Sequence, residues 1–302
     1  MALAPDTQRT CAPPDTRALQ VPDTEIGVID LIGVGTFGEV YRAQWRARVV
    51  AVKVLRVERG GRRGAAEDDA RRRERFAREL QLLTALRHPH IVQCLGGSVA
   101  GTSRPFIICE YMNGGTLKRL LRATRPEPTR DLQVALHTAR ALAFLHSLSP
   151  PIVHRDVKSD NYLVRGGAGS MPVVKLSDFG LSRVLASFDE KMTPCGSVAY
   201  SAPEVIRCEA YSERADVYGY GVVLWEVVTH ATEPYAGLTP LQVQMGVSMR
   251  GMRPPLPPSP TADPRLVRIL SACWREVPAQ RPRMQQIVAV LERIRESMNR
   301  RR

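Results

Sequence analysis

The chain has 302 residues, of which 44% are hydrophobic and 24% are charged. This composition is typical of a globular protein long enough to bury a sizeable core, and it excludes a wholly disordered chain. The formal net charge of +13 raises nucleic acid, anionic membranes and acidic proteins as candidate partners.

Arginine supplies most of this charge, because the chain has 38 arginines and only five lysines. A GC-rich coding sequence explains such a bias, so a position that keeps lysine is a candidate for chemistry that requires lysine. Six scattered cysteines without a C-x-x-C pair favour a reduced, intracellular protein with neither a zinc nor a redox motif. The first residues lack the apolar core of a signal peptide, and no segment has the length of a membrane span. We therefore predict a cytoplasmic protein and leave a nuclear pool open.

The first 110 residues predict a strand-rich region behind a tail. Residues 1–24 are proline-rich and lack apolar periodicity, which predicts a disordered tail. Residues 26–55 follow the pattern strand, glycine loop, strand, turn, strand. Residues 56–75 are polar and strongly charged, which predicts a flexible basic connector that leads into a helix. The apolar positions of that helix run from Phe76 to Leu86, and two apolar runs at 91–95 and 106–109 predict strands.

The remainder of the chain predicts mainly helices after a turn or hinge at Asn113–Gly115. A helix is expected at 131–146, short strands at 161–164 and 173–176, a long loop at 178–204, and helices near 215–229, 239–248, 263–274 and 283–297. The sequence therefore predicts an α+β protein with a small strand-rich lobe followed by a larger helical lobe. We expect a ligand in the cleft between the two lobes.

Gly33, Gly35 and Gly38 form the first chemical motif, a G-x-G-x-x-G run. A dinucleotide-binding turn would lead into a helix, but the residues after this run continue as a strand. We therefore expect a hairpin whose backbone approaches phosphates closely. Lys53 follows on the third strand, where a compact point charge can hold phosphates. A buried ammonium needs a partner, and Glu79 is the natural one.

Three more motifs follow in order: His154-Arg155-Asp156 with Asn161, Asp178-Phe179-Gly180, and Ala202-Pro203-Glu204. Together with the glycine run and Lys53, they resemble the signature set of protein kinases. The resemblance covers nearly the whole chain and implies a bilobal kinase fold. Its implied bounds are a tail at 1–24, an N-lobe at about 25–112, a C-lobe at about 113–297 and a basic tail at 298–302.

The resemblance implies phosphoryl transfer, in which catalysis consists largely of positioning and electrostatics. Asp156 would accept or orient the proton of the substrate hydroxyl, and Lys158 would neutralise the γ-phosphate of ATP. Lys53 would hold the α- and β-phosphates while paired with Glu79. These four residues are the candidate catalytic set.

The resemblance also implies contacts to Mg²⁺, to ATP and within the core. Asn161 and Asp178 would hold Mg²⁺, because hard oxygen ligands suit that ion. Leu83, Cys94, His154 and Phe179 would stack as an internal hydrophobic spine that Asp216 would anchor. Glu204 with Arg281 would form a buried ion pair. The residues expected around the adenine ring, with Cys109 as the gatekeeper, are Ile32, Val40, Ala51, Cys109, Glu110, Met112 and Leu163.

The loop from Lys158 to Asn161 resembles serine/threonine kinases, whereas residues 216–226 and Cys273-Trp274 resemble tyrosine kinases. This mixture is typical of the tyrosine-kinase-like group of serine/threonine kinases, such as Raf, mixed-lineage and many plant kinases. We predict serine/threonine specificity and leave dual specificity open. Arg155 implies regulation by activation-loop phosphorylation, with Thr193 as the first candidate site.

Two other functions compete with an active kinase. A nucleotide-binding pseudokinase scaffold commonly lacks the phosphate-binding lysine, the catalytic aspartate or the metal-binding aspartate, and this chain keeps all three. A nucleic-acid binder is disfavoured because aromatic residues make up only 6% and no binding motif is present. The basic connector and the basic residues 293–302 leave acidic protein partners open.

Overall fold

A computed structural model describes residues 21–35, 38–56, 65–99, 102, 104–166, 170–185, 196–257 and 263–300, apart from the side chains of 65–67. The described chain divides into two compact units. The first is β-rich and contains the chain up to Met112 together with Asp178–Gly180. The second is mainly helical and contains Asn113–Ser177 and the chain from Leu181 onward. A small strand-rich region and a larger helical one agree with the predicted fold class.

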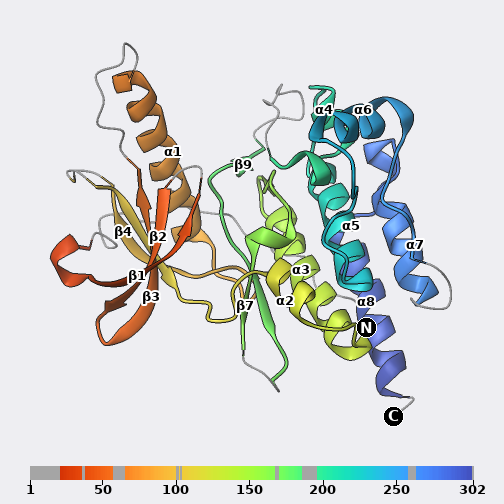
Figure 1. The fold of residues 1–302 in the computed structure, drawn as a ribbon, viewed down its shortest axis with the longest axis horizontal. Helices are drawn as coiled ribbons and strands as arrows, with labels where there is room; N and C mark the ends of the chain where they lie inside the picture. Colours follow the sequence, from red (N-terminus) through yellow and green to blue (C-terminus); the bar gives the residue numbers. More distant parts are fainter. Residues whose placement is uncertain are drawn as a thin grey trace. The chain divides into compact units, whose positions relative to one another are not determined.

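The β-rich unit is a five-stranded antiparallel sheet in the order β1-β2-β3-β5-β4 (Figure 1). Its elements are β1 (Gly27–Val34), β2 (Gly38–Trp45), β3 (Arg48–Leu55), helix α1 (Ala65–Ala85), β4 (Cys94–Ser98) and β5 (Phe106–Glu110). Alternate side chains of β3 and β5, including Val50, Val52 and Ile108, are buried in one core cluster. This burial follows from the period of two along a strand, which sends every second side chain to the same face.

Helix α1 begins at Ala65, inside the stretch predicted as a flexible connector, so that prediction is wrong for its second half. The charged residues lie on a helical surface, where pairs four residues apart stabilise the helix. Arg73 Nε lies 2.9 Å from Asp69 Oδ2, and Arg78 Nη2 lies 2.5 Å from Glu74 Oε1.

The structure corrects two further boundaries in the β-rich unit. The predicted disordered tail ends too late, because Val21 is buried in the sheet core and Asp23–Glu25 form a 3-10 turn. The strand predicted at 91–95 begins at Cys94 and continues through two glycines to Ser98. A Cβ on Gly97 would lie 2.6 Å from the carbonyl oxygen of Phe106. Glycine therefore lets β4 and β5 approach here.

The helical unit is built around α5, which is buried along almost its whole length and packs against α3 and α7 (Figure 1). Helix α3 packs in turn against α8. The elements are α2 (Leu117–Ala123), α3 (Pro128–Ser147), β6 (Ile152–Val153), a 3-10 turn at Ser159–Asn161, β7 (Tyr162–Arg165), β8 (Val173–Leu176), β9 (Arg183–Val184), a 3-10 turn at Val198–Tyr200, α4 (Pro203–Ile206), α5 (Arg214–Thr229), α6 (Pro240–Arg250), α7 (Pro264–Cys273), a 3-10 turn at Pro278–Gln280 and α8 (Met284–Asn299).

Several features of this unit bear on the predictions. Arg281 is fully buried and donates to both carboxylate oxygens of Glu204 at 2.6 and 2.8 Å, so the expected ion pair is confirmed. The basic tail predicted from residue 298 begins as helix, because α8 continues to Asn299. Among the described residues, no helix has the length and apolar character needed to cross a membrane.

Candidate active site

Lys53, Glu79 and Asp178 form an ionic cluster within the β-rich unit. Strand β3 presents Lys53, and Glu79 lies on the buried face of α1. Lys53 Nζ lies 2.6 and 2.9 Å from the two carboxylate oxygens of Glu79 and 3.0 Å from Asp178 Oδ1. The expected pairing of Lys53 with Glu79 is therefore present.

Electrostatics keeps this lysine charged. Burial disfavours the ammonium, but the carboxylates of Glu79 and Asp178 outweigh burial and hold the pKa of Lys53 above its ordinary value. The Glu79 side chain is 3% exposed, whereas that of Asp178 is 42% exposed. Asp178 also has a left-handed backbone, with φ of 59°. A fixed cation beside an accessible carboxylate suits the binding of phosphate and a metal ion.

The glycine run has one glycine that the protein itself requires and two that it does not. A Cβ on Gly38 would lie 2.0 Å from the carbonyl oxygen of Val54 on β3, so a side chain there would force the strands apart. Among the described residues, which do not include 36 and 37, a Cβ on Gly33 or Gly35 would meet no atom closer than 3.8 Å. Protein packing thus leaves space above the latter two glycines, as expected for a backbone that phosphates approach.

The residues expected around the adenine ring are divided between the two units. Ile32 is 42% exposed, Met112 is buried, and Val40, Ala51, Cys109 and Glu110 are half-buried, all in the β-rich unit. Leu163 lies on β7 of the helical unit. Ala51 and Cys109 are direct partners across β3 and β5, so they lie side by side in the sheet.

Cys109 is also the direct cross-strand partner of Cys94 on β4. The hydrogen bond to Cys94 and burial together raise the pKa of the Cys109 thiol well above its ordinary value. Because the thiolate is the reactive form of cysteine, Cys109 is a small, neutral and unreactive side chain at this position.

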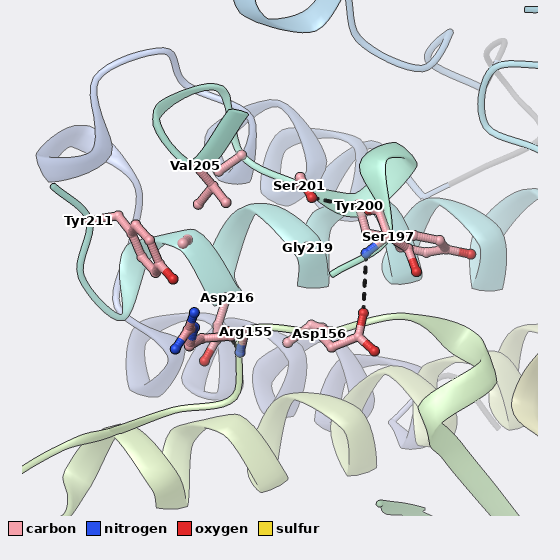
Figure 2. Close-up of a pocket in the computed structure, with 12 residues that line it drawn as sticks. Arg155, Asp156, Ser197, Tyr200, Ser201, Val205, Tyr211, Asp216 and Gly219 are labelled. Carbon is pink, nitrogen blue, oxygen red and sulfur yellow. Dashed lines mark hydrogen bonds between the residues drawn. The ribbon is translucent and has the colours of Figure 1, made fainter. Parts of the chain in front are cut away.

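Asp156, Lys158, Asn161 and Ser197 converge in the helical unit. Lys158 Nζ lies 2.7 Å from Asp156 Oδ2 and donates to Ser197 Oγ at 3.1 Å. Asn161 Nδ2 donates to Asp156 Oδ2 at 2.9 Å and to the Asp156 carbonyl oxygen at 2.8 Å. The Ser197 amide donates to Asp156 Oδ1 at 3.3 Å (Figure 2). One carboxylate oxygen is therefore firmly held, and the other accepts a single long hydrogen bond from the part of the chain that the structure describes.

Asp216 anchors the loop before Asp156, beyond the role at the hydrophobic spine that the resemblance implies. Its two oxygens accept from the amides of His154 and Arg155 at 2.8 and 2.9 Å. Burial disfavours this carboxylate, but His146 and the backbone donors outweigh burial and lower the pKa of Asp216. Arg155 has φ of 72°, so these hydrogen bonds hold an unfavourable backbone conformation in place.

A small cavity lies between this loop and the turn that begins at Ser197 (Figure 2). Its volume is about 20 Å³, which suffices for about one water molecule. Arg155 and Tyr211 face each other here, with the guanidinium carbon 5.9 Å from the ring centroid. This cavity is too small for a nucleotide and does not alter the assignment of the site.

Motif reasoning missed the buried carboxyl of Glu226, which is hydrogen-bonded to the catalytic loop. Glu226 Oε1 accepts hydrogen bonds from Ser159 Oγ and Tyr200 Oη, both at 2.9 Å. Ser159 lies between two residues of the catalytic loop, and Tyr200 lies in the turn that follows Ser197. The only signal in the sequence is a glutamate inside the apolar stretch of α5. The predicted regulatory residue Thr193 lies outside the described residues.

The fold and both clusters define a class of phosphotransferase, and the comparisons agree. Residues 26–291 match the family model for protein tyrosine and serine/threonine kinases. The chain therefore belongs to the protein kinase family, whose members act with ATP and a divalent metal ion. Within the β-rich unit, the space that the described residues leave above Gly33 and Gly35 fits a phosphate, and the accessible carboxylate of Asp178 fits a divalent metal ion.

Curated relatives place the chain near particular kinases. It is 38% identical over 283 residues to the probable serine/threonine-protein kinase drkB of Dictyostelium discoideum, covering 93% of this chain and 38% of the relative. It is 36% identical over 278 residues to the serine/threonine-protein kinase CTR1 of Arabidopsis thaliana, covering 90% and 32%. It is 37% identical over 292 residues to mitogen-activated protein kinase kinase kinase 10 of Mus musculus, covering 95% and 30%. The chain thus spans about a third of the length of these relatives.

Proposed function

We propose that the chain is an ATP-dependent protein kinase that transfers the γ-phosphate to serine or threonine hydroxyls of protein substrates. One observation carries most weight: Asp156 is held by Lys158 at 2.7 Å and Asn161 at 2.9 Å, so the catalytic-loop residues are both retained and ordered. A pseudokinase scaffold has no need of this arrangement. The names of the curated relatives favour serine and threonine as acceptors.

Asp156 would orient the acceptor hydroxyl and receive its proton. Its Oδ2 already accepts from Lys158 and Asn161, whereas Oδ1 accepts from the described residues only the long bond of the Ser197 amide. Oδ1 is therefore the oxygen available to the substrate. Lys158 would neutralise charge on the transferred phosphoryl group. Its ammonium lies beside Asp156 Oδ2, the carboxylate oxygen that already has two donors, and so leaves Oδ1 to the substrate.

Lys53, paired with Glu79, would hold the α- and β-phosphates of ATP, with the expected ring contacts around its adenine. Asn161 and Asp178 would hold Mg²⁺, the divalent ion we propose, and that ion would offset charge on the phosphates when bound. The amide nitrogen of Asn161 is occupied by Asp156, and its Oδ1 accepts no hydrogen bond from the described residues. An amide oxygen and a carboxylate are ligands that suit a hard cation.

Arg155 and Thr193 form the proposed regulatory pair. A phosphate on Thr193 would add nearly two negative charges, which arginine can bind through charge-assisted hydrogen bonds. We also propose a cytoplasmic location and retain acidic proteins as partners of the basic segments.

Phosphosite mapping by mass spectrometry tests the function. The protein is dephosphorylated and then incubated with ATP and magnesium beside Asp156→Asn, which keeps the size of the side chain but loses its charge. We expect new phosphate on serine or threonine, including Thr193, only in the unsubstituted protein. Removing the metal with EDTA should abolish the signal, and adding Mg²⁺ in excess should restore it.

The matched control is Asp263→Asn, an aspartate at the start of α7 that is not part of either cluster. It should behave as the unsubstituted protein. Phosphate on tyrosine alone would contradict the proposed specificity. Equal phosphorylation of Asp156→Asn would contradict the proposed role of Asp156, and no phosphorylation of the protein or of a general substrate would favour a scaffold.

A further inference from the structure

A hollow on the surface of the helical unit is rich in cations. Its volume is about 310 Å³. The residues that line it are Thr116, Lys118, Arg119, Arg122, Ala123 and Asp160. Most of them belong to α2 or cap it, whereas Asp160 belongs to the catalytic loop. The hollow therefore combines three cations with one carboxylate and borders the loop that contains Asp156.

Two of the cations already have acidic or polar partners. Lys118 Nζ lies 3.3 Å from Asp160 Oδ2. Arg122 Nε donates to Thr232 Oγ1 at 2.8 Å, and its Nη2 lies 3.7 Å from Glu233 Oε1. The pair with Glu233 is exposed on both sides, so it contributes little to stability and can rearrange.

Arg119 is the cation without a partner. It is exposed, and no described residue forms a hydrogen bond or an ion pair with its guanidinium. Its side chain extends back over Gly115, where an added Cβ would lie 3.4 Å from Arg119 Cδ and 3.8 Å from Nη1. Arginine presents five donors in a rigid fork that matches a carboxylate or a phosphate. The hollow therefore has an unused site for an anion.

The position of the hollow limits which anion can reach it. Asp160 follows Asp156 by four residues, and a chain spans at most about 3.5 Å per residue, so the two Cα atoms lie within about 14 Å of each other. An extended peptide advances about 3.3 Å per residue. A substrate whose acceptor hydroxyl lies at Asp156 therefore reaches the hollow with a side chain at most about four residues away.

We propose that this hollow binds an anionic side chain of the protein substrate, within about four residues of the acceptor, and that Arg119 determines this specificity. The inference rests on the proposed kinase function and names a substrate class for it. A glutamate or aspartate carboxylate and a phosphorylated side chain share the required chemistry.

A peptide series tests the proposal. Each peptide has one serine acceptor in a neutral background, with a single glutamate, phosphothreonine or lysine at each of the four positions on either side. The enzymes are the unsubstituted protein, Arg119→Glu and the control Arg293→Glu, which reverses an exposed charge on α8 outside the hollow. Circular dichroism melting establishes that all three fold alike.

We expect glutamate at one position to raise kcat/KM about fivefold over the neutral peptide, the size of a partly exposed charge interaction. Arg119→Glu should lose this gain and favour lysine at the same position, while Arg293→Glu should keep the original preference. A larger gain for phosphothreonine than for glutamate would identify a previously phosphorylated substrate, and comparable gains would identify an acidic one. Either result supports the hollow.

Equal kcat/KM for glutamate and neutral peptides at every position would overturn the proposal, as would an unchanged preference in Arg119→Glu. If no peptide accepts phosphate, the proposed kinase function is contradicted, but the proposal for the hollow is still tested by binding. Fluorescence anisotropy with labelled peptides that carry alanine at the acceptor position measures whether the hollow binds the acidic side chain. Tighter binding of the acidic peptide to the unsubstituted protein than to Arg119→Glu supports the hollow. Equal binding refutes it.

Discussion

Glu226→Gln should stabilise the protein, and the gain should grow as the pH rises. Burial raises the pKa of Glu226 to about 8 from an ordinary 4.5, against the opposing effect of hydrogen bonds from Ser159 and Tyr200. Its Oε2 is buried and has no hydrogen-bond partner among the described residues. The carboxyl is therefore neutral at pH 7 in the folded protein and ionised in the unfolded chain.

The direction and size of the effect follow from proton linkage. Below about pH 4.5 both states hold the proton, and the carboxyl contributes its full stability. As the pH rises towards 8, the unfolded chain has lost the proton that the folded protein keeps, so the free energy of unfolding falls and then levels off. At about 1.4 kcal/mol for each pH unit the ceiling is about 5 kcal/mol, of which about 3 kcal/mol falls between pH 5.5 and 8. Glutamine keeps the shape of the neutral carboxyl but does not titrate, so Glu226→Gln does not lose this free energy of unfolding as the pH rises.

Urea unfolding followed by tryptophan fluorescence, at intervals from pH 5.5 to 8.5, measures the difference. The free energy of unfolding of Glu226→Gln minus that of the unsubstituted protein should rise by about 1–3 kcal/mol over this range, with the lower figure allowing for relaxation around the site. Glu296→Gln, at a glutamate 60% exposed on α8, should follow the unsubstituted protein at every pH. A constant difference between Glu226→Gln and the unsubstituted protein would refute a raised pKa at this site.

Two further predictions concern packing around the site. Arg281→Met should lower the free energy of unfolding, measured with urea, by about 3–5 kcal/mol, because it leaves the Glu204 carboxylate buried without its partner. Replacing both residues with apolar ones should recover most of this loss. A double variant as unstable as Arg281→Met would count against this reasoning. Gly38→Ala should destabilise the sheet by about 1–3 kcal/mol, because its Cβ would meet a β3 carbonyl oxygen at 2.0 Å. Gly35→Ala has no such contact, so it should keep the melting temperature and weaken ATP binding in a nucleotide titration; equal melting of the two variants would contradict the packing argument.

The elements that the sequence predicted best have strong periodicity within a short window. The apolar stretch before Leu55 forms β3, and the strand predicted at 173–176 is β8 with the same bounds. The helices predicted at 215–229 and 283–297 differ from α5 and α8 by at most two residues at either end. In these segments local pattern and tertiary burial agree, so the pattern is sufficient.

The misses have tertiary causes. Helix α2 has only seven residues and basic side chains between its buried Leu117 and Leu121, so no helical pattern stands out. The strand predicted at 91–95 stopped before the two glycines of β4, because nothing in the sequence reveals how closely β5 approaches there. Glu226 could not be related to the catalytic loop, since Ser159 lies 67 positions away and only the packed fold brings them together. Motifs located the candidate catalytic residues, but the side chains that hold these residues in place became apparent only in three dimensions.

The five lysines indicate how far composition alone points to function in this arginine-rich chain. Lys53, Lys158 and Lys118 have a carboxylate oxygen within 2.6, 2.7 and 3.3 Å respectively. Lys175 is buried on β8, and Lys191 lies outside the described residues. An ammonium is a compact charge that can contact one carboxylate oxygen and still face a phosphate, whereas a guanidinium favours a planar, two-point contact. Family motifs single out the first two lysines, but Lys118 belongs to no motif and borders the hollow at Arg119. Lys118 is thus one of the few lysines of this arginine-rich chain, and it lines the hollow that we propose selects the substrate.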